Sequence, residues 1–160
     1  MRAMARNFGG GRALGGLVTG RGVMSSRILL VEDEILVALE LEATAQDLGH
    51  EVVGIAAATE TALRLAPGAD IALVDVNLRD GETGPAIGRR LAQEYGITVV
   101  FVTANPGQLG DGVPGALGVV SKPCDERIAA RVISFAQAHR DRMKGFEPPP
   151  QITLFAEANA

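Results

Sequence analysis

Five short apolar runs recur along the chain, and their spacing is the feature that most limits how it can fold. All five are rich in Ile, Leu and Val and are expected to be strands, at residues 28–31, 51–56, 71–74, 97–102 and 117–120. The runs at 28–31 and 71–74 hold no polar residue. Such runs are typical of parallel strands that are buried on both faces of a sheet.

Segments with helical periodicity separate the runs. Helices are expected at about 35–48, at 59–65 with Thr59 as the N-cap, in the segment that ends at Tyr95, and at 124–140. Strands that alternate with helices predict an α/β fold, a parallel sheet covered by helices. The segment 105–115 breaks the alternation, because its many Gly and Pro residues disfavour a stable helix.

The composition excludes several classes of protein. The 160 residues include one Cys, which rules out an intramolecular disulfide framework and a site built from several thiolates. No apolar run approaches the roughly 18 residues that a membrane span needs. The formal net charge of -4 has the wrong sign for a protein whose main partner is nucleic acid. We therefore expect a small cytoplasmic protein with neither nucleic-acid nor membrane partners.

The composition also divides the chain into three parts. Residues 1–26 hold four arginines, many glycines and no acidic residue, so we expect a disordered basic leader. An organellar transit peptide is the alternative for this segment, and Met24 is an alternative start. Residues 27–140 are expected to form one domain. Residues 141–160, with three consecutive prolines, are expected to be a flexible C-terminal tail.

Polar residues follow the expected strands at the points where they end. After the first, third, fourth and fifth runs come Glu32 and Asp33, Asp75, Thr103, and Ser121 and Lys122. The carboxyl ends of parallel strands meet at one edge of a sheet, so these side chains should gather there. Three carboxylates repel one another unless a hard cation lies between them, and Mg²⁺ suits best because it readily bridges to a phosphate. A carboxylate beside Mg²⁺ can accept a phosphoryl group, whose charge a Lys and a Thr can stabilise.

Four motifs lie in order along the expected domain. They are Leu-Val-Glu-Asp-Glu at 30–34, Leu-Val-Asp-Val-Asn-Leu at 73–78 with Asp-Gly at 80–81 and Thr-Gly at 83–84, Val-Thr-Ala at 102–104, and Ser-Lys-Pro at 121–123. With these motifs the chain resembles the receiver domain of bacterial two-component response regulators over residues 27–140. The resemblance implies a flavodoxin-like (CheY-like) doubly wound sheet of five parallel strands in the order 2-1-3-4-5, with a short or disordered fourth helix.

The resemblance also implies a role for each site residue. Asp75 would be the phosphoacceptor. Glu32, Asp33 and Asp75 would hold Mg²⁺ together with the main-chain carbonyl of Asn77.

Two further residues complete the implied site. Thr103 would bind the phosphoryl group and move with it, and Lys122 would pair with a phosphoryl oxygen. The Lys122–Pro123 peptide bond would be cis, an X-Pro form that is otherwise in the minority.

The chain departs from the common receiver pattern at two places. Val119 stands where receivers usually carry an aromatic residue on the fifth strand, and the Gly- and Pro-rich segment 105–115 replaces or shortens the fourth helix. The chain is similar to a divergent subset of stand-alone receivers from alphaproteobacterial stress-response circuits. Signalling is therefore expected to use an order–disorder change in 105–115 in place of an aromatic flip.

The function that follows is that of a single-domain response regulator, a phosphoacceptor protein and not an enzyme beyond self-catalysed phosphoryl transfer and slow autodephosphorylation. A sensor histidine kinase or a histidine phosphotransfer protein would phosphorylate Asp75 in a Mg²⁺-dependent reaction. Only 20 residues follow Arg140, so no output domain is expected. Output would come from protein–protein contact, of which a phosphorylation-dependent dimer is one form, or from draining phosphoryl groups away from a competing regulator.

Three alternatives have different sequence requirements. A receiver-like adaptor that is never phosphorylated would not need the five residues Glu32, Asp33, Asp75, Thr103 and Lys122. An aspartyl phosphatase would need a second Asp two residues after its nucleophile as the general acid, but Asn77 stands there. A flavin mononucleotide protein is disfavoured, because the acidic residues at 32–34 would repel the phosphate.

Overall fold

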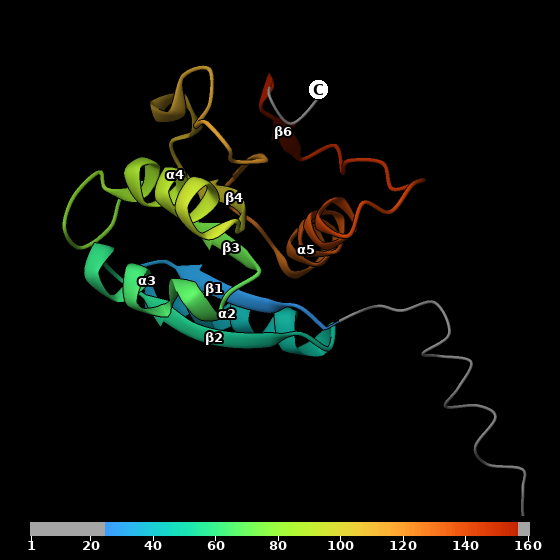
Figure 1. Ribbon diagram of the computed structural model, residues 1–160, viewed down its shortest axis with the longest axis horizontal. Helices are drawn as coiled ribbons and strands as arrows, with labels where there is room; N and C mark the ends of the chain where they lie inside the picture. Colours follow the sequence, from blue (N-terminus) through green and yellow to red (C-terminus); the bar gives the residue numbers. More distant parts are fainter. Residues whose placement is uncertain (1–24, 157–160) are drawn as a thin grey trace, which may run out of the picture.

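The computed structural model describes residues 25–156 of the chain (Figure 1). The basic leader predicted for residues 1–26 lies almost wholly outside the described residues. The strands are β1 (Arg27–Val31), β2 (Glu51–Ala56), β3 (Ile71–Val74), β4 (Thr98–Thr103), β5 (Gly118–Ser121) and β6 (Ile152–Leu154). The helices are α2 (Ile35–Asp47), α3 (Thr59–Leu65), α4 (Gly84–Tyr95) and α5 (Glu126–Arg140), with short 3-10 helices η1 (Ala66–Gly68) and η2 (Pro106–Leu109).

The strands form one sheet in the order β2-β1-β3-β4-β5-β6. The first five are parallel, which confirms the predicted order 2-1-3-4-5. All four residues of β3, which lies between β1 and β4, are buried. The uninterrupted apolar run at 71–74 is therefore explained by a strand that is covered on both faces.

The helices cover the two faces of the sheet in pairs (Figure 1). On one face, α3 and α4 pack on alternate strand residues such as Leu29 and Phe101. On the other face, α2 and α5 pack on the intervening residues, including Leu30 and Val100. Successive strand side chains point to opposite faces, so each apolar run supplies both halves of the core.

Three helix ends show which residues cap the helices. Gly96 ends α4 in the left-handed conformation with φ 65°, directly after the helix end that was predicted at Tyr95. The side chain of Asp125 caps α5 by accepting a hydrogen bond from the Ile128 N–H at 2.9 Å. The prediction of Thr59 as the N-cap of α3 was wrong. The cap position is Ala58, and the Thr59 hydroxyl bonds instead to the distant Asp80.

Asp80 joins the two loops that follow β2 and β3. Its carboxylate accepts hydrogen bonds from the Thr59 N–H at 3.1 Å, the Thr59 hydroxyl at 2.6 Å and the Thr83 hydroxyl at 2.6 Å. The bond from the Thr59 hydroxyl, then the bond from the Thr83 hydroxyl and then the bond from the Thr59 N–H lower the pKa of Asp80 to about 2. A carboxyl group whose pKa is lower in the folded state stabilises the fold at pH values above its unfolded pKa. This contribution is lost as the pH falls through its folded pKa.

This geometry predicts the titration of one carboxyl group. In a carbon-13 NMR titration, Asp80 should be half-protonated near pH 2. Replacing both Thr59 and Thr83 with Val should raise the midpoint toward the ordinary value of about 3.9. A wild-type midpoint already near that ordinary value would show that the two threonines do not hold the carboxylate.

The segment that was expected to contain a short or disordered fourth helix contains one turn of 3-10 helix, η2. Of the two predicted possibilities, a short helix and a disordered one, the short helix is therefore confirmed. Gly110, Gly112 and Gly115, which follow this turn, all have positive φ angles. L-residues with a side chain rarely adopt that conformation, which explains why the glycine-rich segment does not continue as an α-helix.

The C-terminal segment gives the main correction to the predicted fold. The sheet has a sixth strand, β6, which pairs antiparallel with β5, and the flexible tail predicted for 141–160 did not anticipate it. Ile152 and Phe155 are buried, at 8% and 7% exposure. Three residues of alternating polarity are too short a signal to be recognised as a strand without the neighbouring strand that they pair with.

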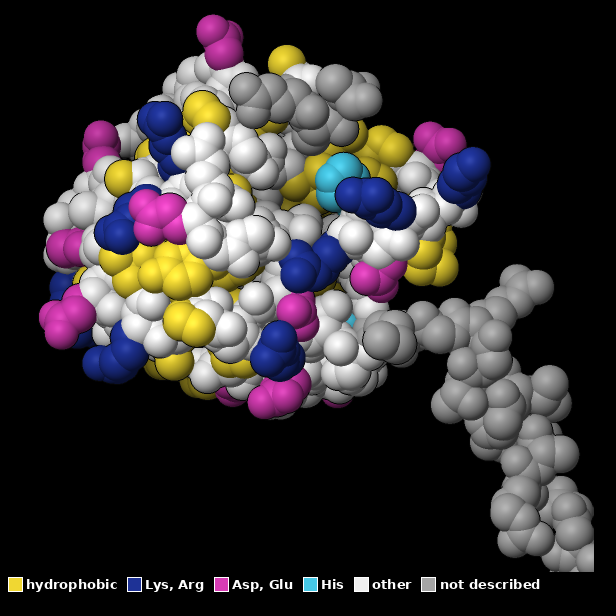
Figure 2. Space-filling model, in the orientation of Figure 1, with side chains coloured by type: hydrophobic (Ala, Val, Ile, Leu, Met, Phe, Trp, Pro, Cys, Tyr) yellow, Lys and Arg dark blue, Asp and Glu magenta, His cyan; other side chains and the backbone are white. Residues whose placement is uncertain are grey.

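Within residues 25–156, the helices are all too short or too polar to cross a membrane. On the face drawn in Figure 2, basic and acidic side chains are interspersed among apolar and neutral ones. The described residues therefore form no continuous basic surface on that face.

Candidate functional site

The residues predicted for the site lie where the carboxyl ends of four strands meet. Glu32 directly follows β1, Asp75 follows β3, Thr103 ends β4, and Lys122 follows β5. Glu32, Asp75 and Thr103 are buried, with exposures of 3%, 6% and 0%. Buried polar groups at the edge of an otherwise apolar core have to be held by partners, so their contacts define the site.

The Lys122 ammonium is the centre of these contacts. Its Nζ atom lies 2.8 Å from Oε2 of Glu32 and 2.8 Å from Oδ2 of Asp75. The same atom lies 3.6 Å from Oε1 of Glu34. One ammonium therefore faces three carboxylates, two of them buried, and cannot neutralise all three.

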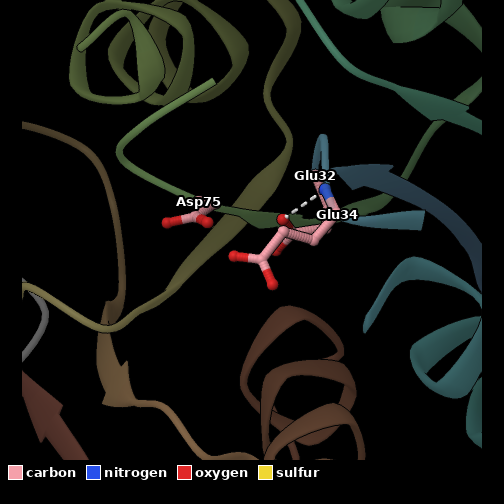
Figure 3. Close-up of side chains that lie close together, drawn as sticks. All are labelled: Glu32, Glu34 and Asp75. Atoms are coloured by element: carbon pink, nitrogen blue, oxygen red, sulfur yellow. Dashed lines mark hydrogen bonds between the residues drawn. The ribbon is translucent and has the colours of Figure 1, made fainter. Parts of the chain in front are cut away.

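The three carboxylates form one compact group, which Figure 3 shows. Oxygen atoms of Glu32, Glu34 and Asp75 lie within 4.8 Å of one another. Backbone N–H groups hold two of them in place. The Glu34 N–H donates to Oε1 of Glu32 at 3.0 Å, and the Val76 N–H donates to Oδ1 of Asp75 at 2.7 Å.

The electrostatics of the group differ from one residue to the next. Burial raises the pKa of Glu32, and the neighbouring Asp75 charge adds to the rise, although the bond to Lys122 opposes it. For Lys122, burial acts against the charge, but the hydrogen bonds to Asp75 and Glu32 outweigh burial and raise its pKa. Lys122 is thus held as a cation at any physiological pH.

Glu34 is a member of the group that the sequence did not single out. Asp33, which was predicted as a metal ligand, has an exposed side chain and is not among the three clustered carboxylates. Glu34 itself has an extended backbone, with φ -81° and ψ 102°. In an extended chain, alternate side chains share one side, which is the signal that could have paired Glu32 with Glu34. The ligand role of Asp33 stays a prediction.

Two hydrogen bonds connect the site to the segment around η2. The hydroxyl oxygen of Thr103 accepts a bond from the Asn105 N–H at 3.1 Å. The side-chain amide of Asn77 donates to Gln108 at 3.0 Å, and Gln108 in turn bonds to Glu82. The segment that replaces the fourth helix is therefore linked to residues beside both Asp75 and Thr103.

Two other details of the predicted site can be compared with the structure. The Lys122–Pro123 peptide bond is cis, which confirms that prediction. Val119 stands where receivers usually carry an aromatic residue. It is buried at 7% exposure and pairs with Thr153 of β6. The phosphoryl-binding role of Thr103 and the carbonyl-ligand role of Asn77 stay predictions.

The donor set matches a hard divalent cation. Carboxylate oxygens within a few ångströms of one another are the ligands that Mg²⁺ prefers, and three such groups beside a single ammonium leave an excess of negative charge. The residues present therefore form an acidic cluster of the kind that binds Mg²⁺ in receiver domains.

Comparison with known proteins identifies relatives of this site. The chain is 34% identical over 129 residues to the phyllosphere-induced regulator PhyR of Methylorubrum extorquens, which covers 74% of this chain and 48% of PhyR. The chain thus spans about half the length of this curated relative. No family model matches the chain.

Solved structures give the same result. The PhyR response regulator REC domain of Erythrobacter litoralis has 32% identity and a TM-score of 0.63, covering 70% of this chain and 89% of that domain. The response regulator PhyR of Brucella abortus has 30% identity and a TM-score of 0.62, covering 79% of this chain and 55% of that protein. A CheY-like receiver domain protein of Methanospirillum hungatei, at 21% identity with a TM-score of 0.62 and coverages of 74% and 98%, shares the fold. The chain belongs to the response regulator receiver (REC) domain family and is related to the PhyR receivers.

Proposed function

We propose that Asp75 accepts a phosphoryl group from a phosphohistidine, and that this phosphorylation is the signal that the chain carries in a two-component pathway. Receiver domains are phosphoacceptor signalling proteins and not true enzymes, so the proposal concerns which residue is modified and how. The observation that carries it is the 2.8 Å contact between the Lys122 Nζ atom and Oδ2 of Asp75 inside the acidic group.

The transfer needs one nucleophile and charge stabilisation. A carboxylate oxygen of Asp75 attacks the phosphorus atom, the P–N bond to the donor histidine breaks, and the imidazole nitrogen keeps the electron pair of that bond. Lys122, which already contacts Asp75, pairs with a phosphoryl oxygen, and the Thr103 hydroxyl donates to another. The later hydrolysis by water returns the Asp75 carboxylate and inorganic phosphate.

Glu32, Asp33, Asp75 and the main-chain carbonyl of Asn77 are the residues that would hold Mg²⁺. When bound, the ion supplies positive charge to the phosphoryl oxygens during transfer. Glu34 adds a third clustered carboxylate to the field that attracts the cation. The buried carboxylates of Glu32 and Asp75 together carry more negative charge than the Lys122 ammonium balances. This excess favours the binding of a divalent ion.

The proposal is tested by removing the metal. Incubation with a small phosphodonor such as acetyl phosphate and Mg²⁺ should add the mass of one phosphoryl group to the intact chain. Chelation of the metal should reduce the uptake by about 100-fold, because charge stabilisation of the transferring group is lost. No uptake even at saturating Mg²⁺ would favour the adaptor alternative, and release of phosphate from many unrelated phosphomonoesters would favour a phosphatase.

The start of α2 offers a surface for the protein that donates the phosphoryl group. Ile35, Leu36 and Leu39 are 60%, 74% and 45% exposed, and they directly follow the acidic residues of the site. Exposed apolar side chains beside a reactive group suit a partner that has to place a phosphohistidine there. We propose this face as the docking surface for the histidine kinase or phosphotransfer protein.

Replacing Leu36 with Ser separates docking from chemistry. Transfer from a phosphorylated histidine kinase that acts on the wild type should fall by about 10-fold, which corresponds to the loss of one apolar anchor. Uptake from acetyl phosphate should not change, since Leu36 is largely exposed and is not one of the reacting groups. Tyr95→Ser is the matched control, because Tyr95 is another large exposed hydrophobic residue and lies at the C-terminal end of α4. An equal loss of phosphoryl uptake with both donors would show that Leu36 supports the fold and not the docking of the kinase.

The output of the phosphorylated protein is proposed to be protein–protein contact. A phosphorylation-dependent dimer is one form of such contact, and draining of phosphoryl groups away from a competing regulator is the alternative output. The two forms differ in a measurable way, because a dimer doubles the mass in light scattering whereas a phosphate sink leaves it unchanged.

A further inference from the structure

The strand β6 covers the edge of β5 with a small number of interactions. Only three residue pairs join the strands, from Gly118 with Leu154 to Val120 with Ile152. One bond extends the ladder, from the Phe155 N–H to the Leu117 carbonyl. A strand held by so few ladder pairs has the features of a segment that opens locally at low free-energy cost.

Side chains on both faces of the sheet hold β6 in place. Ile152 belongs to the apolar cluster under α2 and α5, whereas Phe155 belongs to the cluster under α4. The Phe155 ring packs on the buried Phe101 ring with centroids 6.3 Å apart. β6 thus binds the rest of the domain in the manner of a peptide with two anchors, one on each face.

The edge of β5 is shaped to accept a strand. A Cβ atom on Gly118 would overlap the Thr153 carbonyl oxygen of β6 and come within 3.1 Å of the Leu154 Cα. Its three nearest neighbours all belong to β6, so the missing side chain serves this contact. Unpaired strand edges form hydrogen bonds with other extended chains unless something covers them.

Hydrogen bonds and a shared apolar cluster connect the site to this edge. Asn105 bonds to Thr103, and Gln108 bonds to Asn77, so both ends of the turn η2 are tied to the site. Leu109, in the last position of η2, is buried in the same cluster as Phe155. A few residues further on, a Cβ atom at Gly112 would lie only 2.7 Å from the Phe155 Cγ. A displacement of the segment 105–113 therefore alters the surface on which Phe155 packs.

We propose that β6 is a detachable occupant of the β5 edge, and that the uncovered edge binds an extended strand of a partner protein. The coupling to the site rests on the proposed function. When the Thr103 hydroxyl turns toward a phosphoryl group on Asp75, its bond from the Asn105 N–H is lost and the η2 segment moves. Phe155 then loses its support, and β6 leaves the edge.

The chemistry of β6 defines the partner. The strand that replaces it pairs antiparallel with β5 and carries apolar side chains at the positions of Ile152 and Leu154, with an aromatic residue in the place of Phe155. Main-chain hydrogen bonds supply affinity in such strand addition, and the pockets for alternate side chains supply selectivity. Val119 lies in the same apolar cluster as Phe155, so this aromatic position packs beside the β5 residue where other receivers carry an aromatic ring.

Amide exchange of the full chain tests the coupling. On phosphorylation with acetyl phosphate, the Phe155 amide should exchange about 10-fold faster, while amides of β3 keep their protection. Gly118→Ala should produce the same increase without phosphorylation, and Gly68→Ala should not, because a Cβ at Gly68 meets one atom at 4.0 Å. Unchanged Phe155 exchange in a sample shown by intact mass to carry the phosphoryl group would overturn the coupling. Absence of the added mass would instead count against the proposed function.

A labelled peptide of residues 149–156 tests the edge itself, without any phosphorylation. Phe155→Ala weakens the chain's own β6, so the full-length variant should bind the peptide about 10-fold more tightly than the wild type does. Gly118→Ala added to that variant should abolish binding, whereas Gly68→Ala should preserve it. Peptide binding that survives Gly118→Ala, or no gain from Phe155→Ala, would overturn the proposal. A stable dimer of the Phe155→Ala chain would show that a second copy of the chain binds the β5 edge, and would overturn the assignment of the edge to a partner protein.

Discussion

Replacing Asp75 with Asn should reduce phosphoryl uptake from acetyl phosphate to below detection while the fold is retained. Asparagine has nearly the same volume but no carboxylate, and an amide oxygen does not form a stable acyl phosphate. The Lys122 ammonium keeps its 2.8 Å contact with Glu32 in the variant, so no buried cation is left without a partner. Intact mass after incubation with Mg²⁺ measures the uptake, and circular dichroism confirms the fold.

The control for this prediction is another Asp-to-Asn change. Asp111 is exposed and lies outside the acidic group, so Asp111→Asn should take up one phosphoryl group as the wild type does. Uptake that continues in a folded Asp75→Asn chain would show that another residue is the phosphoacceptor. Loss of uptake in both variants would point to an effect of net charge and not to the identity of the nucleophile.

Replacing Lys122 with Met should have the largest effect on stability. Lys122 is the cation shared by Glu32 and Asp75, and its side chain is 12% exposed, against 2% and 7% for theirs. Removing one partner of a buried ion pair leaves charge buried without compensation, which costs about 3 kcal/mol of unfolding free energy. Phosphoryl uptake should also slow by about 100-fold, because one group that stabilises the transferred charge is gone.

The pH dependence of the Lys122→Met defect follows from Glu32. Burial already raises the Glu32 pKa, and loss of the Lys122 bond raises it further. A carboxyl group whose folded pKa lies above its unfolded value destabilises the fold at high pH, and this penalty disappears as the pH falls below the unfolded value. The difference in urea midpoint between variant and wild type should therefore shrink between pH 7 and pH 4.

A second lysine gives the matched control. Lys144 is exposed, and none of its contacts belongs to the acidic group, so Lys144→Met should change the unfolding free energy by less than about 0.5 kcal/mol. A Lys122→Met defect that is small, or that grows on acidification, would contradict the central position of Lys122 among the carboxylates.

Most of the fold could be predicted from the sequence because helices cover both faces of the sheet. Strands such as β3 are covered on both faces, so their residues read as unbroken apolar runs. The helices on the two faces show the complementary periodicity, and Gly96 marks the end of α4 through a conformation that glycine adopts readily. The order of the parallel strands came from the family resemblance and agrees with the structure.

What the sequence could not supply depends on contacts between distant residues. The strand β6 exists because its residues pair with a specific edge at Gly118, and nothing within the three residues Ile152–Leu154 indicates that edge. Thr is a residue type that often caps helices, yet the Thr59 hydroxyl bonds to Asp80, which lies 21 residues further along the chain. Local preference gave way in both cases to tertiary contact.

The site shows the same division. Glu32, Asp75, Thr103 and Lys122 were predicted because parallel strands bring their carboxyl ends together, and the structure places them at that edge. Membership of Glu34 and the bond between Asn77 and Gln108 depend on backbone direction and on loop position. Neither can be read from residue type alone.

The proposed function depends on one covalent bond, so its most direct test is to locate that bond. Brief phosphorylation with acetyl phosphate and Mg²⁺, followed by borohydride reduction, converts an acyl phosphate into a stable alcohol that peptide mass spectrometry can assign. The reduced residue should be Asp75 and no other. Reduction at a different acidic residue, or none in a chain that has gained the phosphoryl mass, would contradict the assignment of Asp75 as the phosphoacceptor.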